Sequence, residues 1–99
     1  MELKFEVRLT RAFSDWLDSL ANEIAIEAIV RRIARVQLGN FGDHKPVGDG
    51  VSELRIQHGP GYRVYYTIRG RVIVFMLGGG TKRTQARDIE RAKREAEDI

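Results

Sequence analysis

The residues that decide the fold are 51–78, VSELRIQHGPGYRVYYTIRGRVIVFMLG, which contain three consecutive strand patterns. Residues 51–58 and 62–69 alternate apolar and polar side chains, as strands do when they bury one face. Between them, Gly-Pro-Gly at 59–61 predicts a turn, because glycine tolerates positive φ and proline restricts its own φ. Residues 71–77 are apolar on both faces, which is typical of a central strand covered on both sides. Together these patterns predict an antiparallel meander that ends at the three glycines that follow.

The two faces of this meander differ in chemistry. One face is apolar, because Leu54 and Ile56 are two residues apart and alternate side chains of a strand point to the same face. The other face is predicted to carry the polar and cationic side chains of the two alternating strands: Arg55, Arg63, Tyr65 and Arg69. Arg55 and Arg63 flank the Gly-Pro-Gly turn, so we expect both guanidinium groups on one face, projecting away from the core.

The first part of the chain predicts a strand and two helices. Residues 3–9 alternate as an opening strand does. Thr10 is a suitable N-cap for a short amphipathic helix, and Asn22 caps a second helix over residues 23–38, which Gly39 ends. A short loop joins the helices, so we expect an antiparallel hairpin against the apolar sheet face. The second helix also carries three arginines on a side away from its apolar residues: Arg31, Arg32 and Arg35.

The remaining segments predict a loop and a last helix. Residues 40–50, NFGDHKPVGDG, are dense in Gly, Asp and Pro, and should form a loop that brings His44 and Lys45 near the meander. Thr81 or Thr84 could cap a helix that runs nearly to the C-terminus. Its apolar stripe is thin, so we expect it to be the most mobile element. The fold class is therefore α+β, in the order strand, two helices, three strands and helix.

Length and composition exclude several classes of protein. Ninety-nine residues with 42% hydrophobic content predict one domain, residues 1–99, with a modest core. No apolar stretch approaches the ~20 residues of a membrane span, and no signal peptide is visible. The chain has no cysteine, which excludes disulfides and thiolate metal sites, and only two histidines. We therefore expect a cytoplasmic protein without a structural metal or cofactor.

Charge is distributed unevenly along the chain. Residues 44–87 contain eight basic residues and two acidic ones, a net charge of +6, whereas the rest of the chain sums to −3. A basic patch on an otherwise acidic molecule indicates a polyanionic partner, most simply nucleic acid. Thirteen of the seventeen cationic residues are arginine, which favours bidentate phosphate contacts. The alternative for Arg69, Arg71 and Arg87 is an ordinary solvated surface.

The cationic face could support chemistry on RNA. RNA carries its own nucleophile, the 2′-hydroxyl, so a protein can promote cleavage by positioning and charge stabilisation. Arginines would neutralise the developing phosphorane, a nearby lysine or histidine would move protons, and a tyrosine ring could stack on a base. A cationic sheet that docks an acidic protein segment explains the same spacing equally well.

Two long segments carry a family resemblance. GNFGDHKPVGDGVSELRIQHGPGYRVYY, residues 39–66, and GGGTKRTQARDIERA, residues 78–92, resemble the RelE/ParE toxin superfamily of type II toxin–antitoxin modules, and within it the HigB-like addiction module killer branch. The resemblance covers nearly the whole chain. It implies a small α+β toxin that is inhibited by a helix-turn-helix antitoxin encoded beside it. Relatives of this type cleave mRNA in the ribosome.

The resemblance also assigns roles to residues. The arginine of the GYR segment, here Arg63, contacts the scissile phosphate in relatives, and the basic residue on the preceding strand falls at Arg55. The basic pair after the last strand falls at Lys82 and Arg83. Around these four candidate catalytic residues, the basic and aromatic positions expected to bind RNA are Lys45, Tyr65, Arg69 and Arg87.

The chain departs from the family pattern in two places. Active nucleases of the superfamily carry two lysines on the strand before the GYR turn, where this chain has Arg55 and Gln57, and residues 86–99 contain neither tyrosine nor histidine. His58 could act as the proton carrier, although its parity with Ile56 predicts that it faces the core. Since another branch of the superfamily poisons DNA gyrase, three functions stay open: an mRNA endoribonuclease, a gyrase poison and a basic protein-binding module.

Overall fold

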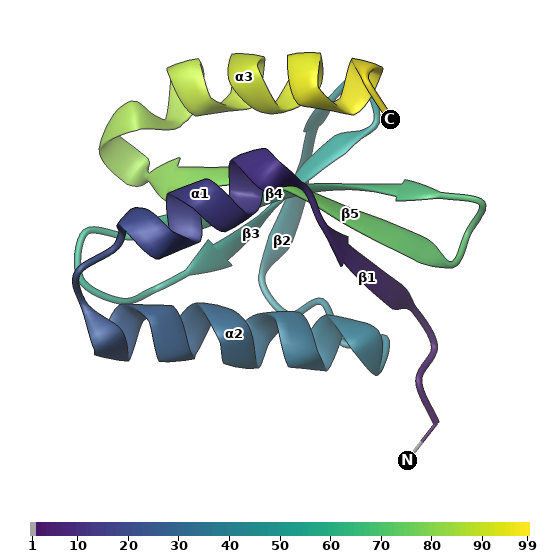
Figure 1. The fold of residues 1–99 in the computed structure, drawn as a ribbon, viewed down its shortest axis with the longest axis horizontal. Coiled ribbons are helices and arrows are strands. Elements are labelled where there is room, and N and C mark those ends of the chain that lie inside the picture. The colour runs from purple at the N-terminus through teal and green to yellow at the C-terminus, as the bar shows by residue number, and fades with distance from the viewer. Residues whose placement is uncertain (1) are drawn as a thin grey trace.

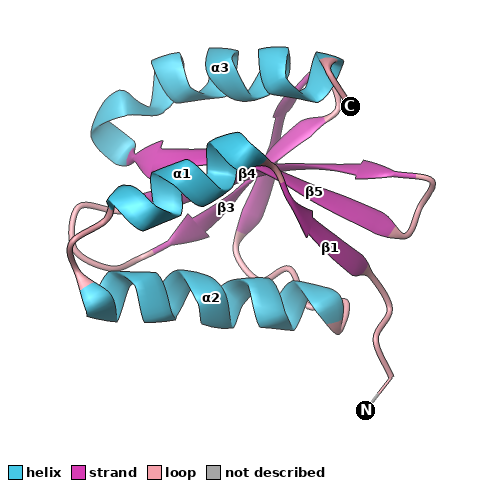
Figure 2. Cartoon of the chain, in the orientation of Figure 1, coloured by secondary structure: helices cyan, strands magenta, loops and turns pink. Residues whose placement is uncertain are grey.

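The computed structural model describes residues 2–99, which form one five-stranded sheet with helices on both faces (Figures 1 and 2). The strands are β1 (Glu6–Leu9), β2 (His44–Gly48), β3 (Val51–Ile56), β4 (Tyr62–Arg69) and β5 (Ile73–Thr81). The helices are α1 (Arg11–Ser19), α2 (Glu23–Gln37), the one-turn 3₁₀ helix η1 (Lys82–Thr84) and α3 (Gln85–Glu97). This element order confirms the predicted α+β fold.

The sheet has the order β1-β5-β4-β3-β2. The meander β3-β4-β5 is antiparallel, as predicted, and β1 adds to β5 in parallel. Figure 1 shows α2 and α3 on opposite sides of the twisted sheet, with α1 beside β5. No helix within residues 2–99 is long and apolar enough to cross a membrane.

Both predicted N-caps of the helical hairpin are present. The Thr10 side chain accepts a hydrogen bond from the Phe13 backbone amide, and the Asn22 side chain accepts from the amides of Ile24 and Ala25. These caps satisfy amide groups that have no partner within the helix. Gly39, with φ of +89°, follows α2 in the left-handed conformation expected of a terminating glycine.

The helical hairpin covers the apolar face of the sheet. Phe13 of α1 and Ile29 of α2 are fully buried there, together with Leu54, Val64 and Met76 of the meander. Burial of such a side chain contributes about 1.5–3 kcal/mol to folding. This face is therefore the main hydrophobic core, in agreement with the alternation in the sequence.

The opposite face is not the open polar surface that the sequence predicted. A second hydrophobic cluster forms there, in which Val51, Tyr65 and Leu77 of the sheet pack against Ala92 and Ala96 of α3. Alanine side chains are short, so they let the helix approach the sheet closely. A thin apolar stripe is thus enough to cover this face, and the greater mobility of α3 remains a prediction.

The segment 40–50, predicted as a loop, contains the edge strand β2. It pairs with β3 in antiparallel orientation, with Lys45 opposite Glu53. Pro46 cannot donate a backbone hydrogen bond, and an outer strand tolerates this loss. Residues 44–48 show no alternation that would reveal a strand, because β2 forms through its pairing with β3.

The sequence predicted that the glycines at 78–80 end the third strand of the meander. In the structure β5 continues through them to Thr81. A Cβ atom at Gly79 would overlap the ring of Trp16, and one at Gly80 would overlap the carboxylate of Asp88. The glycines therefore let α1 and α3 approach the strand, rather than forming a turn.

Candidate active site

An open cavity of about 440 Å³ lies at the end of the sheet where β3 and β4 meet. Residues from the segment before β2, from the β3–β4 hairpin and from η1 line it: Asp43, Arg55, Gln57, His58, Gly59, Pro60, Gly61, Arg63 and Lys82. Three of the four candidate catalytic residues are among them. The sequence predicted that Arg55 and Arg63 share one face, and the fold brings Lys82, the carboxylate of Asp43 and the imidazole of His58 to them.

The register of the hairpin brings the two arginines together. Arg55 and Arg63 are directly paired across β3 and β4, so their side chains leave the sheet on the same face. Lys82 joins them because its backbone amide donates a 2.8 Å hydrogen bond to the carbonyl oxygen of Gly61. Gly61 has φ of +79°, a conformation that favours glycine and that shapes this turn beside η1.

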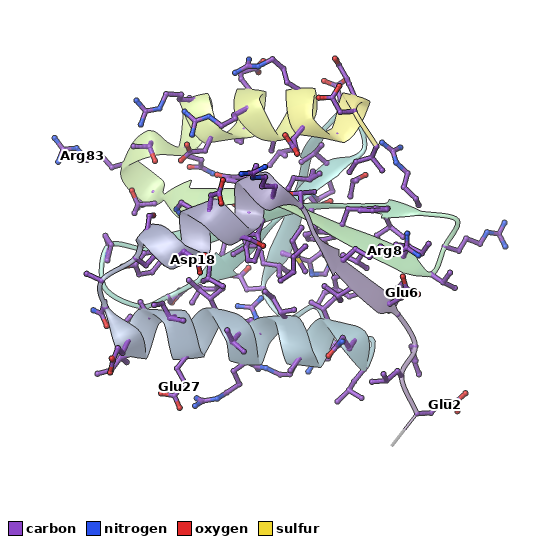
Figure 3. All side chains as sticks on the ribbon, in the orientation of Figure 1. Glu2, Glu6, Arg8, Asp18, Glu27 and Arg83 are labelled. Carbon is purple, nitrogen blue, oxygen red and sulfur yellow. The ribbon has the colours of Figure 1, made fainter. Side chains whose placement is uncertain are left out.

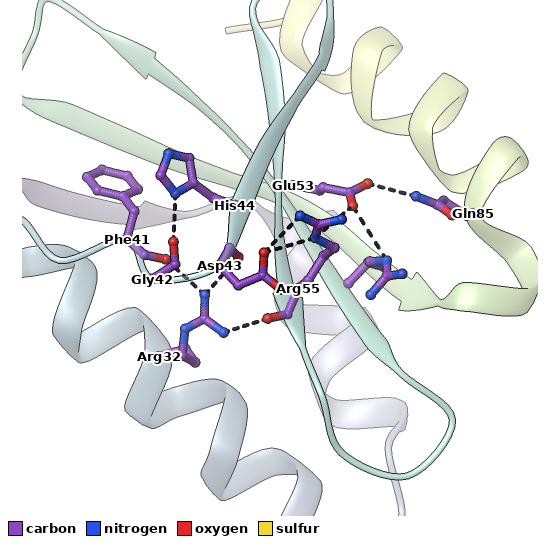
Figure 4. Close-up of polar contacts among 9 residues, drawn as sticks. Arg32, Phe41, Gly42, Asp43, His44, Glu53, Arg55 and Gln85 are labelled. Atoms are coloured by element: carbon purple, nitrogen blue, oxygen red, sulfur yellow. Dashed lines mark hydrogen bonds and ion pairs between the residues drawn. The ribbon is translucent and has the colours of Figure 1, made fainter.

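A buried carboxylate lies behind both arginines. The Glu53 side chain is 1% exposed, and its Oε2 atom lies 3.6 Å from Nε of Arg63 and 3.8 Å from Nε of Arg55. Its Oε1 atom accepts a 2.8 Å hydrogen bond from the Gln85 side chain at the start of α3 (Figure 4). Because the Arg63 side chain is only 12% exposed, the expectation that it projects freely away from the core is wrong.

A second carboxylate holds Arg55 from the solvent side. Oδ1 of Asp43 accepts hydrogen bonds from Nε and Nη2 of Arg55 at 3.1 Å and 2.8 Å (Figure 4). Both side chains are partly exposed, so this pair is screened by water and contributes little to stability. In contrast to Glu53, Asp43 is therefore a partner that an anionic ligand could displace.

Arg32 of α2 fixes the position of Asp43 from behind. Its guanidinium donates to the carbonyl oxygens of Phe41 (2.8 Å), Asp43 (3.1 Å) and Arg55 (2.6 Å). Burial, assisted by the positive charge of Arg35, lowers the pKa of Arg32 from its ordinary value. The sequence placed Arg32 away from the core, but the side chain is buried and ties α2 to the site.

Tyr65 cannot stack on a base as the sequence suggested, because its side chain is fully buried under α3. Its hydroxyl, Oε2 of Glu53 and Nε of Arg63 are buried polar atoms without a hydrogen-bond partner within residues 2–99. Burial, and then the nearby negative charge of Glu53, raise the pKa of Tyr65 well above its ordinary value. The phenol therefore stays neutral, and because it is fully buried and does not line the cavity, it cannot reach a ligand there.

The fold does not bring the other predicted residues to the cavity. Arg83 is exposed and points away from the body of the molecule (Figure 3), and Lys45 and Arg87 are exposed outside the lining. Arg69 lies at the far end of β4, where its guanidinium donates a 2.9 Å hydrogen bond to the carbonyl oxygen of Ala96. These four residues are basic, like the residues of the site, but they do not line the cavity.

His58 reaches the cavity because β3 ends before it. The strand stops at Ile56, and the backbone amide of His58 donates a 3.0 Å hydrogen bond to the Ile56 carbonyl as the chain begins to turn. His58 is consequently half-buried in the cavity wall, and the expectation from strand parity that it faces the core is wrong. The other histidine, His44, is exposed and lies outside the lining.

The carboxylates of the site, Asp43 and Glu53, are not predicted as site residues from the sequence. Glu53 has the same strand parity as Arg55, and this parity was the available signal that the two share a face. No local signal linked Asp43 or Gln85 to the site, because both come from other elements. Within residues 2–99, no group of three His, Cys, Asp or Glu side chains could hold a metal ion.

The arrangement is suited to binding an oxyanion. Three cationic side chains line the cavity: Arg55, Arg63 and Lys82. Of the two carboxylates that pair with the arginines, only Asp43 is accessible to exchange with a ligand. A phosphate that displaced Asp43 would meet a guanidinium able to donate two parallel hydrogen bonds. Gln57 and His58 add a polar group and a possible proton carrier at the cavity edge.

Comparison of the sequence with known proteins finds a family and a close relative. Residues 15–97 match the model of the family described as "Phage derived protein Gp49-like (DUF891)". A protein of Haemophilus influenzae, described only as uncharacterized, is 45% identical over 97 residues, which cover 98% of each chain.

Comparison of the structure finds RelE toxins. A mutant of the Escherichia coli toxin RelE in the free state aligns with a TM-score of 0.72 and 19% identity, over 93% of this chain and 97% of that one. A chain of the RelBE2 toxin–antitoxin complex of Mycobacterium tuberculosis aligns with a TM-score of 0.63 and 20% identity, over 81% of this chain and 100% of that one. The protein therefore belongs to the Gp49-like family of phage-derived proteins and has the fold of the RelE toxins.

Proposed function

We propose that this protein is the toxin of a type II toxin–antitoxin module and that it inhibits translation as a ribosome-dependent mRNA endoribonuclease. The observation that carries the proposal is the cavity in which Arg55, Arg63 and Lys82 converge beside His58. The likeness to RelE toxins supports the toxin part of the proposal. The cationic cavity supports a phosphodiester as the ligand.

In the proposed reaction, the 2′-hydroxyl of a bound nucleotide attacks the adjacent phosphorus and expels the 5′-oxygen of the next nucleotide. Arg63 and Arg55 stabilise the negative charge that develops on the phosphoryl oxygens. His58 or Lys82 moves protons between the attacking and leaving oxygens. Glu53 lies within ion-pair distance of Nε of both arginines, so the terminal nitrogens of Arg63 point to the phosphate, and those of Arg55 become available once the phosphate displaces Asp43.

We also propose a cognate helix-turn-helix antitoxin as the protein partner. The similar Mycobacterium tuberculosis structure is a toxin–antitoxin complex, which supports a partner of this kind. An acidic antitoxin segment on the cationic cavity would neutralise the site by occupying it. Binding should then weaken as salt concentration rises, whereas equal affinity at low and high salt would contradict the electrostatic part of this proposal.

The test is induced expression in bacteria, with growth recorded and RNA 5′ ends mapped across translated genes. We expect growth arrest by the wild type, with new 5′ ends inside codons, and loss of both effects in Arg63→Gln. Lys82→Ala separates chemistry from folding, because Lys82 is exposed and its removal should reduce cleavage without lowering the melting temperature. Arg94→Ala is the matched control, since it removes an exposed cation of α3 outside the cavity.

Other outcomes would reject the nuclease. Growth arrest with double-strand DNA breaks and intact mRNA would indicate a gyrase poison. Normal growth despite a folded and abundant protein would indicate a basic protein-binding module. Full cleavage by Arg63→Gln would remove Arg63 from the mechanism.

A further inference from the structure

A second open cavity of about 240 Å³ adjoins the first one. It lies between α2 and the end of β3, and it shares two lining residues, Gln57 and His58, with the candidate active site. On the α2 side it is lined by three arginines, Arg31, Arg32 and Arg35. The two cavities therefore lie next to each other, with Gln57 and His58 between them.

The second cavity has a cationic lining. Among residues 2–99 no carboxylate lines this cavity, whereas Asp43 lines the first cavity and Glu53 lies behind it. Arg32 is buried and engaged by three backbone carbonyls, so it contributes positive potential but no accessible donor. The accessible donors of the second cavity are therefore those of Arg31 and Arg35.

Arg31 and Arg35 are placed to act as a pair. They are exposed and four residues apart on α2, so they project from the same side of the helix. Arg31 has an exposed partner, Glu27, at 3.3 Å, and such a pair is weak in water. Arg35 takes part in no ion pair within residues 2–99, and like charges at this spacing repel each other. An anion bound between them would relieve this repulsion.

The geometry points to a second phosphate-binding site, and we propose that Arg31 and Arg35 hold the RNA strand where it leaves the candidate active site over His58. The inference rests on the proposed function, because a strand engaged by Arg55 and Arg63 carries one phosphate per nucleotide beyond the cavity. The imidazole of His58, placed between the two cavities, offers a flat surface on which a base can stack. Single-stranded RNA would then be bound more tightly when it is long enough to reach α2.

The experiment measures binding of fluorescent 2′-O-methyl RNA by anisotropy at several salt concentrations. This RNA lacks the nucleophile, so the wild-type protein can be used without cleavage. An oligonucleotide of about three residues probes the first cavity, and one of about ten residues reaches both. The variant Arg31→Gln/Arg35→Gln is compared with Arg91→Gln/Arg94→Gln, which removes the same charge from exposed positions of α3.

We expect the α2 double variant to bind the long RNA at least tenfold more weakly at low salt, with little change for the short RNA. Its salt slope for the long RNA should fall by about 1.4, because each phosphate contact with a single strand contributes about 0.7. The α3 double variant should bind both oligonucleotides nearly as the wild type does. Circular dichroism and thermal melting confirm that both variants fold.

Several results would overturn the inference. If the α2 double variant lost the same affinity for the short and the long RNA, or if both double variants lost the same affinity, the effect would come from net charge alone. A loss of binding to an acidic peptide without a loss of RNA binding would assign the α2 arginines to a protein partner. If the wild type bound neither RNA and Arg63→Gln made no difference, the proposed function itself would fail. RNA binding that depended on Arg63 but not on α2 would leave the proposed function standing.

Discussion

The two faces of the sheet are built on different principles, although adjacent residues of the same strands supply both. The face under α1 and α2 buries a continuous hydrophobic cluster that includes Leu54 and Val64. The face under α3 has a smaller cluster and, beside it, the buried carboxylate of Glu53 between Arg55 and Arg63. The first face stabilises the protein through apolar burial, whereas the second holds charges that are costly to bury and depend on their buried counterion.

The largest expected effect comes from removing the carboxylate that organises the second face. Glu53→Ala should lower the free energy of unfolding by about 3–5 kcal/mol, because two guanidinium groups would lose their buried counterion. Urea denaturation measures this change. Glu53→Gln is the control that keeps the side-chain volume while removing the charge. A loss below about 1 kcal/mol in Glu53→Ala would show that the buried charge is not structural.

The neighbouring residue on the other face provides the matched comparison. Leu54 is fully buried, and Leu54→Ala should destabilise the protein by about 2–5 kcal/mol through lost burial and a residual cavity. Because no charge is involved, the loss should be the same in low and high salt, whereas the loss in Glu53→Ala should vary with salt. Similar salt dependence in both variants would contradict the distinction between the faces.

Tyr65→Phe should have a smaller effect of the opposite sign. The buried phenol hydroxyl has no hydrogen-bond partner within residues 2–99, so its removal should leave stability unchanged or raise it by up to about 1 kcal/mol. Thermal melting at neutral pH measures this change. A marked destabilisation, or a loss of RNA cleavage with folding intact, would assign the hydroxyl a role.

Tyr65→Phe should also differ from the wild type in how its stability changes at alkaline pH. The folded-state pKa of Tyr65 is raised, chiefly by burial, above the value of about 10 that a tyrosine has in an unfolded chain. Above that pH the unfolded chain releases the Tyr65 proton first, so the wild type should lose stability as pH rises. Tyr65→Phe should lose less over the same range, as denaturation at pH 9 and above can measure. An identical decline would show that Tyr65 does not titrate differently in the two states.

The smallest effect on stability is expected at the exposed rim of the site. Asp43→Asn should change the free energy of unfolding by less than about 1 kcal/mol, because its pair with Arg55 is partly exposed. It should nevertheless strengthen binding of 2′-O-methyl RNA, since Arg55 would no longer be held by a competing carboxylate. Weaker binding would mean that Asp43 positions Arg55 productively.

Much of the fold could be predicted from the sequence where a local pattern decided it. Alternation defined β3 and β4, and the capping residues Thr10 and Asn22 defined the starts of α1 and α2. Strand β2 could not be predicted, because its composition is that of a loop and only pairing with β3 makes it a strand. The glycines before η1 were misread for a related reason, since their close neighbours are distant in sequence.

The candidate site divides in the same way. The shared face of Arg55 and Arg63 followed from strand parity and from the turn between them. The position of His58 did not follow from strand parity, because β3 ends at Ile56 and side chains stop alternating where the chain turns. Strand parity, the tyrosine ring and the arginine charge predict that Tyr65 and Arg69 bind RNA, but α3 buries Tyr65 and accepts a hydrogen bond from Arg69.

The sequence by itself determined which residues form the meander and which face carries the arginines, because side-chain direction alternates with a period set by the backbone. Only the tertiary structure decided which of those arginines act together and what neutralises them. Asp43 reaches Arg55 through the loop that Arg32 holds, and Gln85 reaches Glu53 from α3. Contacts of this kind depend on strand register and helix placement, which arise from packing of the whole chain rather than from local spacing.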